Sequence, residues 1–88
     1  MPRVVLLARR ARAELLELSW PVIDAVEEAL LVIEREPDSG YPLRGRLRGL
    51  HSLRVGSLRI IYKIIEDGNT VRVAAIRHRS SAYGRDRR

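Results

Sequence analysis

The sequence predicts an α+β fold: an N-terminal strand, a hairpin of two helices, an antiparallel β-meander, and a short C-terminal tail or helix. Three observations support this order. Apolar residues recur every three or four positions in the first half and every second position in the second half, and Asp67-Gly68 separates two alternating runs. The 88 residues suffice for one domain, which we expect to span residues 1–88, with a core limited to one sheet and two helices.

The first half reads as one strand and two helices. Residues 3–8 are aliphatic and β-branched, which is typical of a strand, and a helical spacing of apolar residues follows. Ser19 and Pro21 mark the start of the second helix, because serine is a common cap and proline is tolerated in a first turn. Pro37 ends this helix. We expect Trp20 to pack between the two helices.

The second half reads as a loop followed by three strands. Residues 37–42 form a loop by composition, and the two glycines of residues 43–50 predict an irregular approach to the sheet. Alternation then indicates strands at residues 51–55, 57–66 and 70–77. Because the turns between these strands are short, we expect them to pair as successive hairpins.

The middle strand of this meander has two different faces. The apolar face carries Leu58, Ile60, Tyr62 and Ile64, and the other face carries Arg59, Ile61, Lys63 and Ile65. Two helices can cover only one face of such a sheet, so the face with Tyr62 is expected under the helices and the face with Arg59 in the open. We therefore expect Tyr62 to be a core residue rather than a catalytic one.

Positive charge is concentrated in the second half of the chain. Residues 1–42 carry five Arg and eight acidic residues, a net charge of −3, whereas residues 43–88 carry eleven Arg, one Lys and three acidic residues, a net charge of +9. A genome rich in G and C would explain the preference for Arg over Lys, but not this segregation. Since the planar guanidinium suits bidentate contact with phosphate, the pattern predicts a nucleic acid partner.

Several classes of function are excluded by what the sequence lacks. It has no cysteine, which excludes disulfides and thiolate metal sites. His51 and His78 are far apart and no carboxylate pair accompanies them, so neither a metal nor a cofactor is expected. The longest apolar run, residues 29–33, is too short to span a bilayer, and residues 4–8 are too short for a signal peptide core. We expect a soluble, cytoplasmic protein without a membrane partner.

Three basic segments and a tyrosine are the candidates for chemistry. Arg54, Arg59 and residues 77–79 lie in the meander, where antiparallel pairing can bring them together near Tyr83. Arginine would stabilise charge that develops on a phosphate during RNA cleavage. Histidine or tyrosine would move protons to and from the 2′-OH and the 5′-oxygen, and tyrosine or arginine would stack on an unpaired base. Taken alone, each of these side chains is more typical of a solvated surface or, for Tyr83, of a cap on the core.

Three segments between Ala8 and Tyr83 together resemble the RelE/ParE superfamily of type II toxins. The first, residues 37–50, reads Pro-Asp-Ser-Gly-Tyr-Pro-Leu-Arg-Gly-Arg-Leu-Arg-Gly-Leu. The second, residues 53–62, is similar to the family's Leu-Arg-Val-Gly-x-x-Arg-x-x-Tyr signature, and the third, residues 78–83, resembles its His-Arg-x-x-x-Tyr ending. The resemblance implies the RelE-like microbial RNase-type fold and a toxin of a toxin–antitoxin system.

The resemblance leaves more than one activity open. RelE-like members cut messenger RNA in the ribosomal A site, without metal, by attack of the 2′-OH, whereas ParE-like members poison DNA gyrase. The His-Arg-x-x-x-Tyr ending is similar to the first group, so we favour an mRNA interferase, an endoribonuclease that causes growth arrest. The alternatives are a gyrase poison without nuclease activity and a non-catalytic module that binds nucleic acid only with its partner.

The resemblance also implies roles for individual residues. Arg59 and Arg79 would hold and stabilise the scissile phosphate. Tyr83 would orient or stack the base or assist proton transfer, and His78 would supply an acid or a base. The other RNA-binding candidates are Arg44, Arg46, Arg48, Arg54 and Arg77. Of these, the first three fit a phosphate-positioning or a plainly solvated run better than a catalytic one.

One departure from the family concerns the general base. Some active RelE-like nucleases carry lysines on the strand before the Leu-Arg-Val-Gly turn, where this chain has Leu50 and Ser52. The single lysine, Lys63, is elsewhere. Either His78 and the arginines carry the reaction, or catalysis is weak.

The resemblance finally implies partners. The main one is a cognate antitoxin, whose acidic and hydrophobic segment would fold on binding and cover the basic cleft or displace the C-terminal region. The substrate would be mRNA on the ribosome, and operator DNA would be contacted through the antitoxin.

Overall fold

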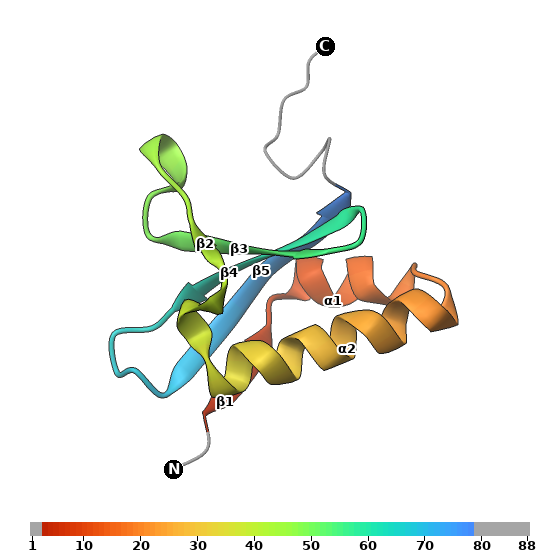
Figure 1. Cartoon of the computed structure of the whole chain (residues 1–88), viewed down its shortest axis with the longest axis horizontal. Coiled ribbons are helices and arrows are strands. Elements are labelled where there is room, and N and C mark those ends of the chain that lie inside the picture. Colours follow the sequence, from red (N-terminus) through yellow and green to blue (C-terminus); the bar gives the residue numbers. More distant parts are fainter. Residues whose placement is uncertain (1–2, 79–88) are drawn as a thin grey trace.

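A computed structural model describes residues 3–78, which form two α-helices on one face of a five-stranded sheet (Figure 1). The elements in chain order are β1 (Val4–Leu7), α1 (Arg9–Leu16), α2 (Trp20–Arg35), the 3₁₀ turn η1 (Pro37–Ser39), β2 (Tyr41–Pro42), the 3₁₀ turn η2 (Gly45–Leu47), β3 (Leu50–Val55), β4 (Leu58–Ile64) and β5 (Thr70–His78). The strand order is β1-β5-β4-β3-β2, with β1 parallel to β5 and the other neighbours antiparallel. The predicted α+β fold and its meander are confirmed here, and the predicted C-terminal tail or helix lies outside the described residues.

The two helices begin where the sequence predicts, but one packing expectation was wrong. Ser19 caps α2 through its carbonyl, which accepts hydrogen bonds from the N–H groups of Val22 at 3.0 Å and Ile23 at 2.9 Å. Trp20 was expected between the helices and is instead 76% exposed. Helical residues are spaced by about 100°, so Trp20 lies about 200° from Val22, on the side away from the stripe that packs on the core. No helix among residues 3–78 is long and apolar enough to cross a membrane.

The core lies between the helices and one face of the sheet. Its largest fully buried side chains are Val26, Ile33, Ile60, Tyr62, Val71 and Val73. The Tyr62 hydroxyl donates a hydrogen bond to the Pro37 carbonyl at 2.6 Å and accepts one from the Gly40 N–H at 2.9 Å. Burial raises the pKa of this hydroxyl above its usual value, although the bond from Gly40 opposes the shift. The prediction that Tyr62 is a core residue is confirmed.

The segment before the meander differs from expectation in one respect. Residues 41–42, expected as loop, form β2, which pairs with β3 at the edge of the sheet. Proline is tolerated in such an edge strand, because its missing N–H leaves no neighbouring strand without a donor. Residues 43–49 are irregular as predicted, whereas Leu50, expected in the same segment, already belongs to β3. Gly45 and Gly49 adopt positive φ angles of 65° and 96°. The Leu43 N–H donates to the Leu50 carbonyl at 2.9 Å and closes this loop.

Candidate nucleic-acid interface

Three arginines form a row across the open face of the sheet. Arg54 on β3 is paired with Arg59 on β4, and Arg59 is paired with Arg77 on β5. Paired residues in an antiparallel sheet point to the same face, and neighbouring strands lie about 4.8 Å apart, so the three Cα atoms lie within about 10 Å. The helices cover the other face (Figure 1). We call Arg54, Arg59 and Arg77 the arginine row.

A β-bulge brings Arg77 into this row. The register shifts between Ile61, which pairs with Ala75, and Tyr62, which pairs with Val73, so that Ala74 is an extra residue in β5. Without the bulge, strict alternation from the buried Val73 would turn Arg77 towards the helices. The bulge inverts the alternation, so that Arg77 reaches the open face. The sequence carried a signal for this bulge. The large apolar residues of β5 stand at odd positions before it, Val71 and Val73, and at an even position after it, Ile76.

The arginine row is unfavourable for stability by itself. Like charges directly opposite each other on neighbouring strands are destabilising, by about 0.2–1 kcal/mol for a pair. Arg59 and Arg77 are also partly buried, which places their charges near a surface of lower dielectric constant than water. Such an arrangement is typical of a surface that binds a polyanion, because an anion placed over the row relieves the repulsion.

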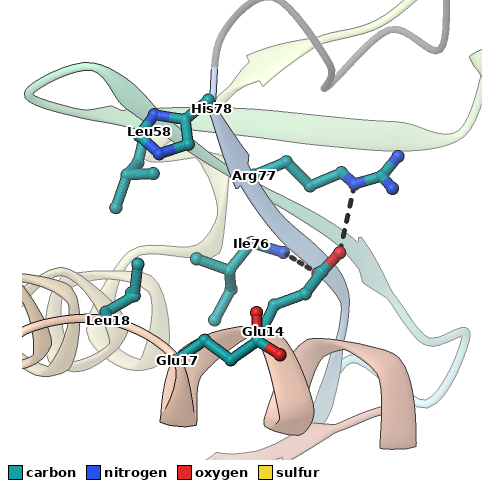
Figure 2. Close-up of a pocket in the computed structure, with 7 residues that line it drawn as sticks. All are labelled: Glu14, Glu17, Leu18, Leu58, Ile76, Arg77 and His78. Carbon is teal, nitrogen blue, oxygen red and sulfur yellow. Dashed lines mark hydrogen bonds and ion pairs between the residues drawn. The ribbon is translucent and has the colours of Figure 1, made fainter.

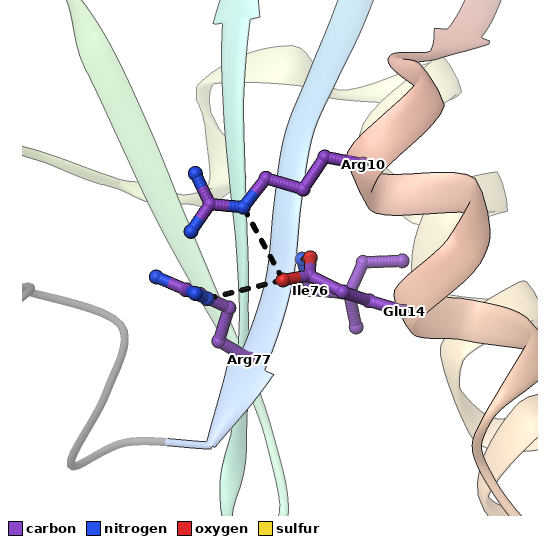
Figure 3. Close-up of polar contacts among 4 residues, drawn as sticks. All are labelled: Arg10, Glu14, Ile76 and Arg77. Carbon is purple, nitrogen blue, oxygen red and sulfur yellow. Dashed lines mark hydrogen bonds and ion pairs between the residues drawn. The ribbon is translucent and has the colours of Figure 1, made fainter.

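Glu14 of α1 contacts the outer end of the row, and sequence reasoning missed it (Figure 3). Its Oε1 accepts a hydrogen bond from the Ile76 N–H at 2.8 Å, and its Oε2 accepts one from the Arg77 Nε–H at 3.1 Å. The Arg10 Nε lies 3.5 Å from the same Oε2. Arg10 and Arg77 therefore share one carboxylate. Glu14 and Arg77 are 63 residues apart in the sequence, so no local pattern indicates their contact.

Tyr41 is a second residue that the sequence analysis missed. It pairs with Ser52, which pairs with Ile61, so these three side chains form the next row of the open face, beside the arginines. Ser52 and Ile61 are buried, whereas Tyr41 is 67% exposed. An exposed ring beside guanidinium groups suits stacking on an unpaired base. Because residues 41–42 read as loop, no face of a strand was assigned to Tyr41.

The remaining basic candidates lie apart from the row. Arg44, Arg46 and Arg48 are exposed around η2, the turn that lies on the side of the sheet away from the helices (Figure 1). Both interpretations of these three arginines, as contacts for phosphates of a long nucleic acid and as solvated surface residues, therefore stay open. Arg79 and Tyr83, both expected to be catalytic, lie outside the described residues and stay predictions.

His78 does not lie in the arginine row. It pairs with the buried Leu58, so it points to the side of the helices while its neighbour Arg77 points to the open face (Figure 2). Strand pairing therefore brings Arg77, and not His78, beside Arg54 and Arg59. The cause is the alternation of a strand, which places consecutive residues on opposite faces.

His78 instead borders a hollow of about 310 Å³ between α1 and the end of β5 (Figure 2). The hollow is lined by Glu14, Glu17, Leu18, Leu58, Ile76, Arg77 and His78. Acidic and basic side chains both line this hollow, and we assign no ligand to it. Among residues 3–78, no group of three or more His, Asp or Glu side chains is arranged to hold a metal ion.

Comparison with known proteins identifies the family. The sequence model described as "ParE toxin of type II toxin-antitoxin system, parDE" matches residues 5–83. This chain belongs to the RelE/ParE superfamily of toxins. Toxin RelG of Mycobacterium tuberculosis is 37% identical to this toxin over 87 residues, which cover 97% of the toxin and 100% of the relative. Toxin RelE of the same organism is 43% identical over 44 residues, which cover 50% of the toxin and 45% of the relative.

Solved structures of the superfamily have the fold of this toxin. A chain of the Mycobacterium tuberculosis toxin–antitoxin complex RelBE2 is 34% identical, with a TM-score of 0.81 over 90% of this toxin and 100% of that chain. A double mutant of the Escherichia coli toxin RelE in the free state is 20% identical, with a TM-score of 0.78 over 94% of this toxin and 90% of that chain. The second likeness concerns the fold alone. The predicted RelE/ParE membership and RelE-like fold are confirmed.

Proposed function

We propose that this toxin is a RelE-like endoribonuclease that cleaves mRNA on the ribosome by attack of the 2′-OH. The observation that carries the proposal is the arginine row, three arginines in register on the face of the sheet opposite the two helices. The full-length similarity to Toxin RelG, and the partial similarity to Toxin RelE, favour a RelE-like over a ParE-like role.

The row suits the charge change of phosphodiester cleavage. When the 2′-oxygen attacks, negative charge grows on the non-bridging oxygens of the phosphate, and fixed guanidinium groups stabilise that charge more than the ground state. Arg59, at the centre of the row, and Arg77 would hold the scissile phosphate, and Arg54 would support binding. Tyr41 would stack on a neighbouring base.

Proton transfer is assigned to a different part of the chain. The 2′-OH must lose a proton and the 5′-oxygen must gain one, which requires a group within hydrogen-bond reach of the phosphate. His78 is not proposed for this role, since it points to the other face. Tyr83 and Arg79 remain our candidates for proton transfer and for charge stabilisation, respectively.

A cognate antitoxin is the proposed regulator. The RelBE2 structure from Mycobacterium tuberculosis is a toxin–antitoxin complex, and its matching chain is 34% identical to this toxin. We expect the antitoxin to cover the arginine row with an acidic segment that orders on binding, and to bring the toxin to operator DNA. The proposed location of the pair is the cytoplasm.

The proposal is tested by mapping mRNA 5′ ends on translating ribosomes. New 5′ ends are expected with the wild-type toxin, and about 100-fold or more less cleavage with Arg77→Ala, because a charge-stabilising group is lost. Arg12→Ala is the charge-matched control, since Arg12 is exposed and lies about 200° around α1 from Glu14. Intact message at concentrations of wild-type toxin that arrest growth would refute the proposal.

A gyrase poison is the second candidate, because the matching family model carries the ParE description and no imidazole among residues 3–78 lies in the arginine row. This alternative predicts cleaved-DNA complexes of gyrase and an SOS response, with intact mRNA. The same expression experiment therefore separates the two candidates.

A further inference from the structure

We infer that Glu14 is a positioning residue of the nuclease site, which holds Arg77 in the arginine row through a hydrogen bond to its Nε–H. The inference rests on the proposed function, because it concerns the arginine that would bind the scissile phosphate. It goes beyond that function by assigning a role to a carboxylate of α1, an element that otherwise only covers the sheet (Figure 3).

The end of β5 needs a partner that the sheet does not supply. β1 pairs with β5 only as far as Leu7 and Val73, and the chain then turns into α1 at Arg9. The outer edge of β5 beyond this point faces α1 instead of a strand, so its N–H groups require another acceptor. The Glu14 carboxylate supplies one, since its Oε1 accepts the Ile76 N–H at 2.8 Å.

The same carboxylate fixes the side chain of the next residue. Its Oε2 accepts the Arg77 Nε–H at 3.1 Å, and the Glu14 side chain is only 22% exposed, which limits competition from water. Backbone and side chain of β5 are thus both held by one glutamate. The terminal nitrogens of Arg77 project beyond Glu14, away from α1, as Figures 2 and 3 show.

This geometry has a consequence for binding. An arginine side chain loses considerable rotamer freedom when it binds a ligand, and a guanidinium that is already held in place loses less. A carboxylate near a phosphate site also repels RNA, which offsets part of the gain in affinity from the ordered side chain. Glu14 is expected to favour the rate of cleavage because it fixes the Arg77 guanidinium in one orientation, in which it can stabilise the charge that develops on the phosphate.

The test compares Glu14→Gln with Glu17→Gln. The glutamine at position 14 keeps an oxygen for the Ile76 N–H but presents its amide to Arg77, so the strand edge is retained and the Arg77 contact is lost. Glu17 is on the same helix and borders the same hollow, and no contact of its carboxylate with Arg77 is described, so it is the matched control. Thermal melts confirm that each variant folds, and Glu14→Asp, one methylene shorter, replaces Glu14→Gln if that variant does not.

Single-turnover cleavage on ribosomes is the first readout. We expect the maximal rate to fall at least about 10-fold in Glu14→Gln, with the half-saturating toxin concentration unchanged or lower, and Glu17→Gln to match the wild type. In an Arg77→Ala background Glu14→Gln is expected to have no further effect. A wild-type rate in Glu14→Gln, or an equal loss in both backgrounds, would overturn the inference.

The second readout does not depend on activity. In ¹⁵N spectra the Arg77 Nε–H is expected to exchange slowly with water in the wild type and in Glu17→Gln, and rapidly in Glu14→Gln. Unchanged exchange in Glu14→Gln would overturn the inference even if the rate falls. A wild-type toxin that cleaves no mRNA would instead overturn the proposed function, and with it the catalytic part of the inference, whatever the spectra show.

Discussion

The two faces of β4 meet opposite physical conditions. On the covered face, Ile60 and Tyr62 are fully buried under the helices. On the open face, Arg59 lies between two further arginines on neighbouring strands. Burial stabilises the first face by about 25 cal/mol per Å² of apolar surface, whereas each like-charged pair destabilises the second by up to about 1 kcal/mol. One strand therefore stabilises the fold with one face and presents positive charge with the other.

This difference suggests that stability and activity depend on different, alternating residues. Substitutions on the covered face are expected to lower the free energy of unfolding and to affect activity only through the folded fraction. Substitutions of the arginines on the open face are expected to lower activity with little effect on unfolding, unlike substitutions of Ile61, which is buried on that face. Neighbouring residues of β4 can be compared directly, because their backbone environment is the same.

The largest effect on stability is expected from Ile60→Ala. Ile60 is 0% exposed and belongs to the core, so its truncation leaves a cavity and lowers the free energy of unfolding by about 2–5 kcal/mol. Urea denaturation measures this loss. Cleavage per folded molecule should match the wild type, and a specific loss of activity would show that the two faces are not separable.

Arg59→Ala tests the neighbouring position. Cleavage is expected to fall by about 10²–10³-fold, because a group that stabilises developing charge is lost. The free energy of unfolding should change by less than about 1 kcal/mol, since removal of one charge also relieves repulsion in the row. A loss of stability as large as that of Ile60→Ala would contradict the division between the faces.

Tyr62→Phe is expected to have an intermediate effect. It removes the hydroxyl that bonds the Pro37 carbonyl and the Gly40 N–H, and leaves both groups buried without that partner. The free energy of unfolding should fall by about 1–3 kcal/mol. A Cβ at Gly40 would overlap the Tyr62 hydroxyl, so Gly40→Ala should destabilise the same contact and should lose part of its effect in a Tyr62→Phe background. Additive effects of the two substitutions would contradict this account.

The smallest effect concerns the hairpin between β4 and β5. Hydrogen bonds from the backbone of Asn69 and from Thr70 lower the pKa of Asp67 below its usual value of 3.8. Because the pKa of Asp67 is lower in the folded than in the unfolded protein, its ionised carboxylate stabilises the fold at any pH above the unfolded-state pKa. This stabilisation is lost as the pH falls through the folded-state pKa. Urea denaturation should therefore show a stability gap between wild type and Asp67→Asn at neutral pH that shrinks in acid. A gap independent of pH would contradict this.

Features with local sequence signals were predictable. The alternation of β4 predicted that Tyr62 is buried and that Arg59 lies on the opposite face, because neighbouring residues of a strand point in opposite directions. The hairpin at Asp67-Gly68 also predicted the meander. These signals need no knowledge of distant residues.

Features that depend on distant contacts were missed. Glu14 contacts β5 across 62 residues, and the bulge at Ala74 decides that Arg77, and not His78, joins the row. Trp20 was expected between the helices because it is large and apolar. Its position around the axis of α2 instead leaves it exposed to solvent. These arrangements depend on how helices and strands pack together in three dimensions. The hydrophobicity of a residue and the periodicity of its own segment do not determine them.

The most direct test of the arginine row is the salt dependence of RNA binding. The probe is a short single-stranded RNA with 2′-O-methyl groups, which prevent attack by the 2′-oxygen. Each lost phosphate contact should reduce the slope of log K against log salt by about 0.7, so the variant with Arg54, Arg59 and Arg77 all changed to Ala should lose about 2 in slope, while Arg12→Ala should match the wild type. An unchanged slope in the triple variant would show that these arginines do not contact the phosphates, and would contradict the account.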